Sequence, residues 1–162
     1  MCAGKTDQIC SLEFADDAHF YMPIQVANRK DVHNGCIFSR TKKCRQITRF
    51  LSKEDAFEWK MPKIVIVDEV QMLSIGQLHK LYKISKEEGI NVYAYGIMFT
   101  FEQVAFETSL VCLQLADEIV KLTSKCDYCN GCISHVNRLI ENVDNFVHAK
   151  FDNCCINCLN KF

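Results

Sequence analysis

The chain has 162 residues, of which 49% are hydrophobic and 24% are charged. This is ordinary globular usage, so the composition excludes intrinsic disorder and collagen-like repeats, and the length allows one domain with a small appendage. Lys plus Arg is 19 and Asp plus Glu is 20, and the net charge of −1 excludes a strong electrostatic field for nucleic acid or an anionic membrane.

Targeting signals and cysteine usage indicate the compartment. The N-terminal segment carries Asp7 and Glu13 and has no apolar signal-peptide core. No run reaches the roughly 18 apolar residues of a membrane span. The 11 cysteines are an odd number without an export signal, which favours reduced thiols or metal over disulfides. We therefore expect a soluble, cytoplasmic protein.

The first third of the chain has weak patterns. Residues 6–13 are predicted to open a helix, and residues 19–26 to form a strand. The polar and basic stretch 33–49 is typical of a solvated hairpin or loop. Residues 52–59 are predicted to form a helix with Ser52 as its N-cap.

The clearest strand covers residues 64–67, a β-branched run that is apolar on both faces, as in a covered parallel sheet. It ends at Asp68 and Glu69. Apolar residues then recur at mostly three- and four-residue steps from Ile75 to Ile84, and Gly89 follows. This spacing predicts an amphipathic helix with a glycine stop.

Alternation of strands and helices continues beyond this helix. Residues 90–97 are predicted to form a strand, 109–116 a helix and 118–123 another strand. The middle of the chain is thus predicted to run β-α-β-α-β, which favours an α/β fold with a three-layer parallel sheet.

Ala3, Gly4, Lys5 and Thr6 form the second half of the phosphate-loop pattern GxxxxGK[ST]. In such a loop backbone N–H groups surround phosphates, the lysine neutralises their charge, and the hydroxyl of Thr6 ligates Mg²⁺. So short a string also matches by chance, and the alternative is a terminus with a fortuitous match.

The acids after the predicted strand 64–67 support the phosphate-loop hypothesis. An apolar strand that ends in an acid is typical of a second element that holds Mg²⁺, here Asp68. Glu69 stands where a base could reach an acceptor hydroxyl. The alternative is a pair of acids that caps a strand end. Because these acids and Lys5 occur together, we favour a nucleotide site.

Six of the 11 cysteines lie in the C-terminal segment. Four of them form two pairs with a two-residue gap, which suits a closed, structural four-cysteine zinc site: Cys126, Cys129, Cys155 and Cys158. Cys132 and Cys154 are competing choices, and we prefer the first set because each of its pairs keeps the two-residue gap and leaves these two cysteines as spares. The alternative is a group of buried free cysteines.

In this order, the phosphate loop, the acidic strand end and the cysteine ribbon resemble the zinc-containing (type II) thymidine kinases, the cellular and bacterial class. Residues 67–72 (VDEVQM) resemble the DEAQF element of that family, and residues 32–35 (VHNG) are similar to its SHxG segment. Residues 115–123 resemble the stretch before its first cysteine pair. Arg138 falls where the family has an arginine, and Phe151 where it usually has tyrosine.

The resemblance implies transfer of the γ-phosphoryl group of ATP to the 5′-hydroxyl of thymidine, giving TMP. It implies a P-loop nucleotide-binding α/β domain over residues 1–123 and a zinc-ribbon and lasso domain over residues 124–162. Structural zinc, and Mg²⁺ with ATP, would be the cofactors. Thymidine and ATP would be the partners, with neither nucleic acid nor membrane, and the chain would be a homo-oligomer, commonly a tetramer in the family.

The resemblance also implies roles for particular residues. Asp68 would support Mg²⁺ with Thr6, and Glu69 would accept the hydroxyl proton, so we expect Lys5 and Glu69 to meet at one site. The nucleotide would be held by Ala3, Gly4, Lys5, Thr6 and Asp68. The thymine ring would lie among Met72, Ile97, Phe101, Phe106 and Phe151. A lasso at about residues 142–151, tethered by the ribbon, would grip the base.

The chain departs from the family pattern at several places. The opening strand and the first loop glycine of the family would lie before Met1, which implies either a truncated or divergent copy whose sheet lacks its first strand, or a sheet in which another element fills that position. Met98 replaces an aspartate, and Phe146 and Val147 occupy the nearest positions to the lasso glycines. Arg29 resembles the arginine of the family's DxR element.

Two other functions compete with the kinase. One is a catalytically inactive homologue that retains the zinc ribbon as an interaction module, which the departures favour. The other is a DNA-binding zinc ribbon, which the near-zero net charge disfavours. Intact Lys5, Thr6, Asp68 and Glu69 favour the enzyme.

Overall fold

The computed structural model describes residues 4–11, 18–55, 62–100, 102–129, 131–134, 136–141 and 150–159. Ala3, Phe101 and residues 142–149 of the expected lasso lie outside these residues. For the strands within 136–141 and 150–154 the course of the backbone is described, but not the side chains.

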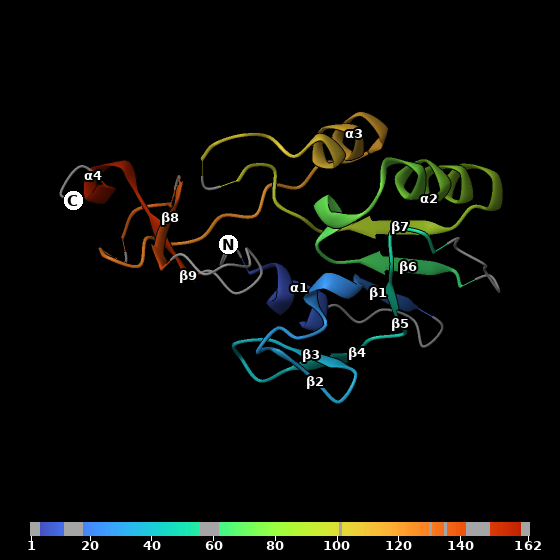
Figure 1. Ribbon diagram of the computed structural model, residues 1–162, viewed down its shortest axis with the longest axis horizontal. Helices are drawn as coiled ribbons and strands as arrows, with labels where there is room; N and C mark the ends of the chain where they lie inside the picture. The colour runs from blue at the N-terminus through green and yellow to red at the C-terminus, as the bar shows by residue number, and fades with distance from the viewer. Residues whose placement is uncertain are drawn as a thin grey trace.

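A parallel sheet of four strands forms the centre of the protein (Figure 1). Its spatial order is β5 (Arg49–Leu51), β1 (His19–Pro23), β6 (Ile64–Val67) and β7 (Asn91–Ala94), and every neighbouring pair is parallel. The strand predicted at 64–67 is confirmed. Its neighbour β7 is shorter than the predicted 90–97, and β1 ends at Pro23 in a short 3₁₀ helix, η1 (Ile24–Val26).

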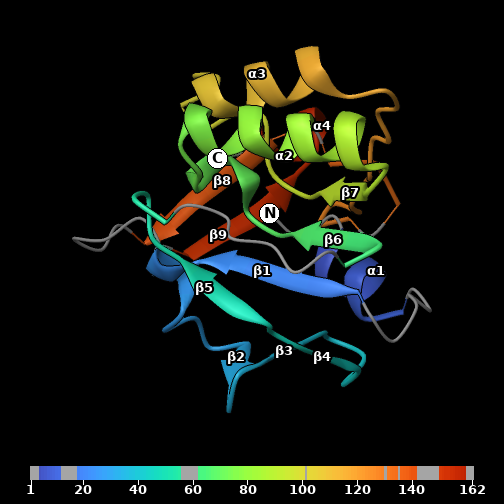
Figure 2. The ribbon, with the colours of Figure 1, turned by 90° about the vertical axis from the view of Figure 1, so that its right-hand side faces the viewer.

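Two helices, α2 (Ile75–Glu88) and α3 (Glu107–Leu115), cover one face of this sheet (Figures 1 and 2). Ser74 and Gln77 form a capping box at the start of α2, and Gly89, with φ 65°, ends it in the left-handed region. Leu78, Leu81 and Ile84 of α2 are buried against the sheet, as their helical spacing predicts.

The opposite face is covered by α1 (Lys5–Ser11) and a small antiparallel sheet. This sheet has the order β2 (Val32–His33), β3 (Cys36–Phe38) and β4 (Cys44–Gln46), so the hairpin predicted in 33–49 is confirmed. Side chains of β1 alternate between the layers: Phe20 joins the core with Ile9 and Ile37, whereas Tyr21 joins the core beneath α2. The three-layer α/β class is therefore confirmed.

The C-terminal segment is a separate small unit of secondary structure. It consists of an antiparallel pair, β8 (Val136–Glu141) and β9 (Lys150–Cys154), followed by a single helical turn, α4 (Ile156–Leu159). Both strands lie away from the central sheet in Figure 1. Among the described residues, none of the helices has both the length and the apolar character to cross a bilayer.

Two local predictions are wrong. Residues 118–123 do not form a strand, because this segment has no partner in a described sheet, and its Ile119 and Val120 are exposed. The helix predicted to begin at Ser52 does not begin there, because residues 53–54 form a turn and residue 55 is not helical; within this turn the Ser52 N–H donates to the Asp55 carboxylate at 2.6 Å. Residues 56–59 of that predicted helix lie outside the described residues.

Candidate functional site

The end of β6 carries the carboxylate pair that the sequence singled out. Asp68 is fully buried, and its backbone N–H donates to the carbonyl of Tyr21 in the neighbouring strand at 3.1 Å. Glu69 has φ 54°, in the left-handed region, and a 3₁₀ turn, η2 (Val70–Met72), follows it. This left-handed residue ends the strand.

Lys5 reaches this carboxylate pair from α1. Gly4, with φ 76°, precedes the helix, a conformation that favours glycine. The Lys5 side chain is only 9% exposed, and its Nζ lies 3.3 Å from Oε1 of Glu69. The expected meeting of Lys5 and Glu69 is confirmed. Thr6 lies in the first turn of the same helix and is half-buried.

A second cation, Arg29, joins the site from the turn after η1. Its Nη1 donates to Oε1 of Glu69 at 2.9 Å and lies 3.9 Å from Oδ2 of Asp68. Its Nε and Nη2 donate to the two carboxylate oxygens of Asp31, at 2.9 and 2.5 Å. Ala27 stands where the DxR pattern would have its aspartate, and Asp31, on the other side of the arginine, supplies a carboxylate instead.

Gln71 connects Glu69 to the segment after β7. Its Nε2 donates to Oε2 of Glu69 at 2.5 Å, and its Oε1 accepts the backbone N–H of Ile97 at 3.3 Å. A Cβ on Gly96 would lie 2.7 Å from Cγ1 of Val70 and 2.9 Å from Oε1 of Gln71, so only glycine fits there without displacement.

The pKa values of the two acids shift in opposite directions. Burial, followed by the charge of Glu69, raises the pKa of Asp68 to about 6. Burial also opposes ionisation of Glu69, but the charges of Lys5 and Arg29 outweigh it and lower the Glu69 pKa. Glu69 is therefore ionised at neutral pH. Within the part of the chain that the structure describes, Oδ2 of Asp68 is buried without a hydrogen-bond donor.

Sequence reasoning did not assign roles to Gln71 or Asp31. Gln71 is part of the DEAQF-like segment, and an amide two residues after a candidate base is itself a signal. Asp31 gave a weaker signal, an acid close to the candidate Arg29 in a loop. Their contacts with Glu69 and Arg29 are evident only in the fold.

The residues expected around the thymine ring are only partly described. Met72 in η2, Ile97 after β7 and Phe106 before α3 are all half-buried. Hydrogen bonds connect their segments: Ser109 Oγ donates to the carbonyl of Ile97 at 2.7 Å, and the Phe106 N–H to the carbonyl of Met98 at 2.9 Å. Phe101 and the side chain of Phe151 lie outside the description, so a nucleoside role for this group stays a prediction.

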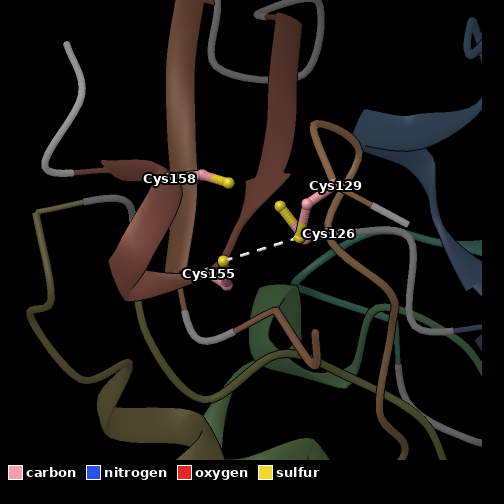
Figure 3. Close-up of side chains that lie close together, drawn as sticks. All are labelled: Cys126, Cys129, Cys155 and Cys158. Atoms are coloured by element: carbon pink, nitrogen blue, oxygen red, sulfur yellow. Dashed lines mark hydrogen bonds between the residues drawn. The ribbon is translucent and has the colours of Figure 1, made fainter. Parts of the chain in front are cut away.

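The four predicted cysteines lie together in the C-terminal unit (Figure 3). The sulfurs of Cys126, Cys129, Cys155 and Cys158 all lie within 4.8 Å of one another, and those of Cys129 and Cys155 are 3.9 Å apart. Four thiolates bound to zinc at about 2.3 Å would have their sulfurs about 3.8 Å apart in a tetrahedron. The cluster can therefore hold a metal ion such as zinc.

The backbone around the first pair supports thiolate ligands. Backbone N–H groups of Cys132 and Gly131 stabilise the charged form of Cys129 and lower its pKa to about 6. Cys126 donates its N–H to the carbonyl of Cys132, which closes the turn between them. Cys132, a competing choice on sequence, is not among the four clustered ligands.

Together these features define the class of the protein: an α/β protein with a parallel sheet, a charged site at the end of one central strand, and a C-terminal cysteine cluster. A sequence model of the thymidine kinase family matches residues 1–159, so the chain belongs to the thymidine kinase family.

Individual relatives agree with this assignment. The chain is 27% identical to a thymidine kinase of Streptococcus thermophilus over 146 residues, which are 86% of this chain and 74% of the relative. A Streptococcus pyogenes thymidine kinase is 28% identical over 146 residues, with 86% and 77% covered. A thymidine kinase of Encephalitozoon cuniculi is 35% identical over 68 residues, 42% of this chain and 32% of the relative.

Proposed function

We propose that this protein is a thymidine kinase, which transfers the γ-phosphoryl group of ATP to the 5′-hydroxyl of thymidine and releases TMP and ADP. Membership of the family and the names of the relatives support the substrates. The observation that carries the proposal is the contact of Lys5 with Glu69, which brings a lysine of phosphate-loop type to the acids at the end of β6.

In the proposed reaction the start of α1 holds the triphosphate of ATP. Backbone N–H groups at Ala3, Gly4 and Lys5 would donate to phosphate oxygens, and Lys5 would neutralise their charge. Lys5 is suited to this because it is buried beside acids, where a charge interaction is weakly screened. Arriving phosphates would compete with Glu69 for the ammonium group.

Glu69 would act as the base that accepts the proton of the 5′-hydroxyl. Its lowered pKa keeps the carboxylate ionised and able to accept a proton. Lys5 and Arg29 bind Oε1, and Gln71 binds Oε2. When phosphates draw Lys5 and Arg29 away, Oε1 becomes available to the hydroxyl. Most of the rate enhancement in phosphoryl transfer comes from such positioning and charge stabilisation.

Asp68, with Thr6, would hold the Mg²⁺ that accompanies ATP. The fit rests on Oδ2 of Asp68, which is buried and lacks a hydrogen-bond donor among the described residues. Carboxylate oxygens are the ligands that Mg²⁺ prefers. When bound, the ion would neutralise charge on the phosphates, and Asp68 would be ionised.

The thymine ring would be held by Met72, Ile97, Phe101, Phe106 and Phe151, together with a lasso at about residues 142–151. Structural zinc in the cysteine cluster would support this loop, since Cys126 and Cys129 precede β8, and Cys155 and Cys158 follow β9. The proposed domain boundary lies at residues 123 and 124. A homo-oligomer, commonly a tetramer in the family, belongs to the same proposal.

Transfer of labelled γ-phosphate from ATP to thymidine tests the proposal. Glu69→Gln should lower turnover about 100-fold or more, because an amide cannot accept the proton. Glu87→Gln is the matched control, since Glu87 is exposed and pairs only with Lys83 at 3.7 Å in the described structure. Full activity of Glu69→Gln would remove Glu69 as the base. No transfer by the wild-type protein would refute the kinase.

A catalytically inactive homologue is the second candidate function. The observation that favours it concerns Glu69. Both of its carboxylate oxygens already accept hydrogen bonds from side chains, which occupy the positions where a substrate hydroxyl would bind. Such a protein would retain the zinc ribbon as an interaction module. It would bind zinc but would not consume ATP when thymidine is added. The kinase would bind zinc and would consume ATP in a thymidine-dependent way.

A further inference from the structure

We propose that Asp31 is a positioning residue, which orients the Arg29 guanidinium so that Nη1 is directed at the carboxylates of Glu69 and Asp68. The inference rests on the proposed kinase function. It concerns an acid that lies outside the phosphate loop and outside the acidic end of β6.

The geometry of the Asp31–Arg29 pair fixes a plane and not only a distance. Nε of Arg29 donates to Oδ1 and Nη2 to Oδ2, at 2.9 and 2.5 Å. Two parallel hydrogen bonds of this kind hold the guanidinium in one orientation, which a single contact cannot do. Nη1 is then the end of the group that points toward Glu69, at 2.9 Å.

The backbone holds both partners of the pair in place. The N–H of Arg29 donates to the carbonyl of Val26 at 3.1 Å, which ties it to η1. The carbonyl of Asp31 accepts the N–H of Phe38 in β3 at 2.7 Å. The small antiparallel sheet therefore acts as the support of Asp31, and through it of Arg29.

The charges at the site explain why this orientation matters for the reaction. Without Asp31, Arg29 would retain the acids Glu69 and Asp68 as partners. Its guanidinium group could then rotate and bind Glu69 through two nitrogens. The arginine would then neutralise the base more completely. With Asp31 in place, Arg29 donates one hydrogen bond to Glu69 through Nη1. A phosphate oxygen can replace Glu69 as the acceptor while the two hydrogen bonds to Asp31 stay intact.

The test compares Asp31→Asn with Asp31→Glu and with a matched control, Asp55→Asn. Asp55 also pairs with an arginine, Arg49, at 2.9 Å, and it is similarly placed at the surface, with side-chain exposures of 24% for Asp55 and 33% for Asp31. We expect Asp31→Asn to lower kcat about tenfold or more, with the KM for thymidine changed less than about threefold. Asp31→Glu should restore part of the loss, and Asp55→Asn should leave kcat unchanged.

A second readout does not depend on activity. Rotation of the Arg29 guanidinium about its Cζ–Nε bond is measured by NMR on protein labelled with ¹⁵N-arginine, with the signal assigned from the Arg29→Lys spectrum. Rotation should be slow in the wild type and in Asp55→Asn, and faster in Asp31→Asn.

The outcomes separate this inference from the proposed function. An unchanged kcat in Asp31→Asn, or equally slow rotation in that variant and the wild type, overturns the role of Asp31. Equal losses of kcat in Asp31→Asn and Asp55→Asn, each in proportion to unfolded protein, reduce Asp31 to a structural residue. If the wild type transfers no phosphate to thymidine, the proposed function fails, and the rotation measurement alone decides whether Asp31 orients Arg29.

Discussion

Nζ of Lys5 lies 3.3 Å from Oε1 of Glu69, although 64 residues separate the two in the chain. The contact joins the first turn of α1 to the end of β6, and both side chains are almost fully buried, with exposures of 9% and 12%. An ion pair in such a place connects folding to function, because the same two charges stabilise the site and would bind the substrate.

The Lys5–Glu69 pair should show measurable coupling in stability. Lys5→Met leaves Glu69 with Arg29 as its remaining cation, and we expect the free energy of unfolding to fall by about 1–3 kcal/mol. A double-mutant cycle with Glu69→Gln, followed by urea unfolding, should give a coupling energy of about 0.5–3 kcal/mol. Additive effects of the two substitutions would contradict direct contact in solution.

Asp68 should destabilise the fold at neutral pH. Its pKa rises from 3.8 to about 6, so between these values only the unfolded chain releases the proton, and stability falls as pH rises through this window. Asp68→Asn removes this cost, and we expect the free energy of unfolding of the variant to exceed that of the wild type by about 3 kcal/mol at pH 7 in Mg²⁺-free buffer.

Urea unfolding at pH 5 to 7.5 checks this difference, which should shrink toward pH 5. The lowered pKa of Glu69 has the opposite sign, because its contribution is lost only as pH falls through that lowered value. Glu69 therefore stays ionised across the range and does not mask the effect. If Asp68→Asn were less stable than the wild type at pH 7, the charge of Asp68 would not destabilise the folded state.

The cysteine cluster should bind one zinc ion per chain. Cys155→Ser removes one of four thiolates, and we expect loss of zinc and of the C-terminal structure, measured by elemental analysis and limited proteolysis. Cys132→Ser is the matched control, since Cys132 lies beside the cluster in sequence but is not one of its four members. Equal loss of zinc in both variants would mean that the ligand set is different.

Gly96→Ala should disturb the site through packing. The added Cβ would approach Cγ1 of Val70 to 2.7 Å and Oε1 of Gln71 to 2.9 Å, so we expect a loss of about 1–3 kcal/mol and a weaker hold of Gln71 on Glu69. Gly76→Ala is the control. It lies in α2 with only Ser74 Oγ near, at 4.0 Å, and should stabilise the helix by about 0.5–1 kcal/mol. Thermal unfolding and turnover measure both variants.

Local patterns predicted much of this fold. The apolar run at 64–67 and the helical spacing of Ile75 to Ile84 correspond to β6 and α2. Both could be predicted because each depends on a hydrophobic pattern within one short segment. The strand expected at 118–123 fails for the opposite reason. β-branched residues there favour an extended backbone, but a strand also requires a neighbour to pair with, and the described sheets offer none.

By itself, the sequence determined the α/β class, the two acids at the end of one strand and the four cysteines. Each of these features is visible as a local pattern: alternating strand and helix periodicities, two acids directly after an apolar run, and two pairs of cysteines with a two-residue gap. Only the tertiary structure decided which cations hold Glu69, since Lys5 and Arg29 lie far from it in the chain and their distances depend on how their segments pack. The orientation of Arg29 by Asp31 is of the same kind, because side-chain direction follows from backbone contacts with η1 and β3 that no local pattern encodes.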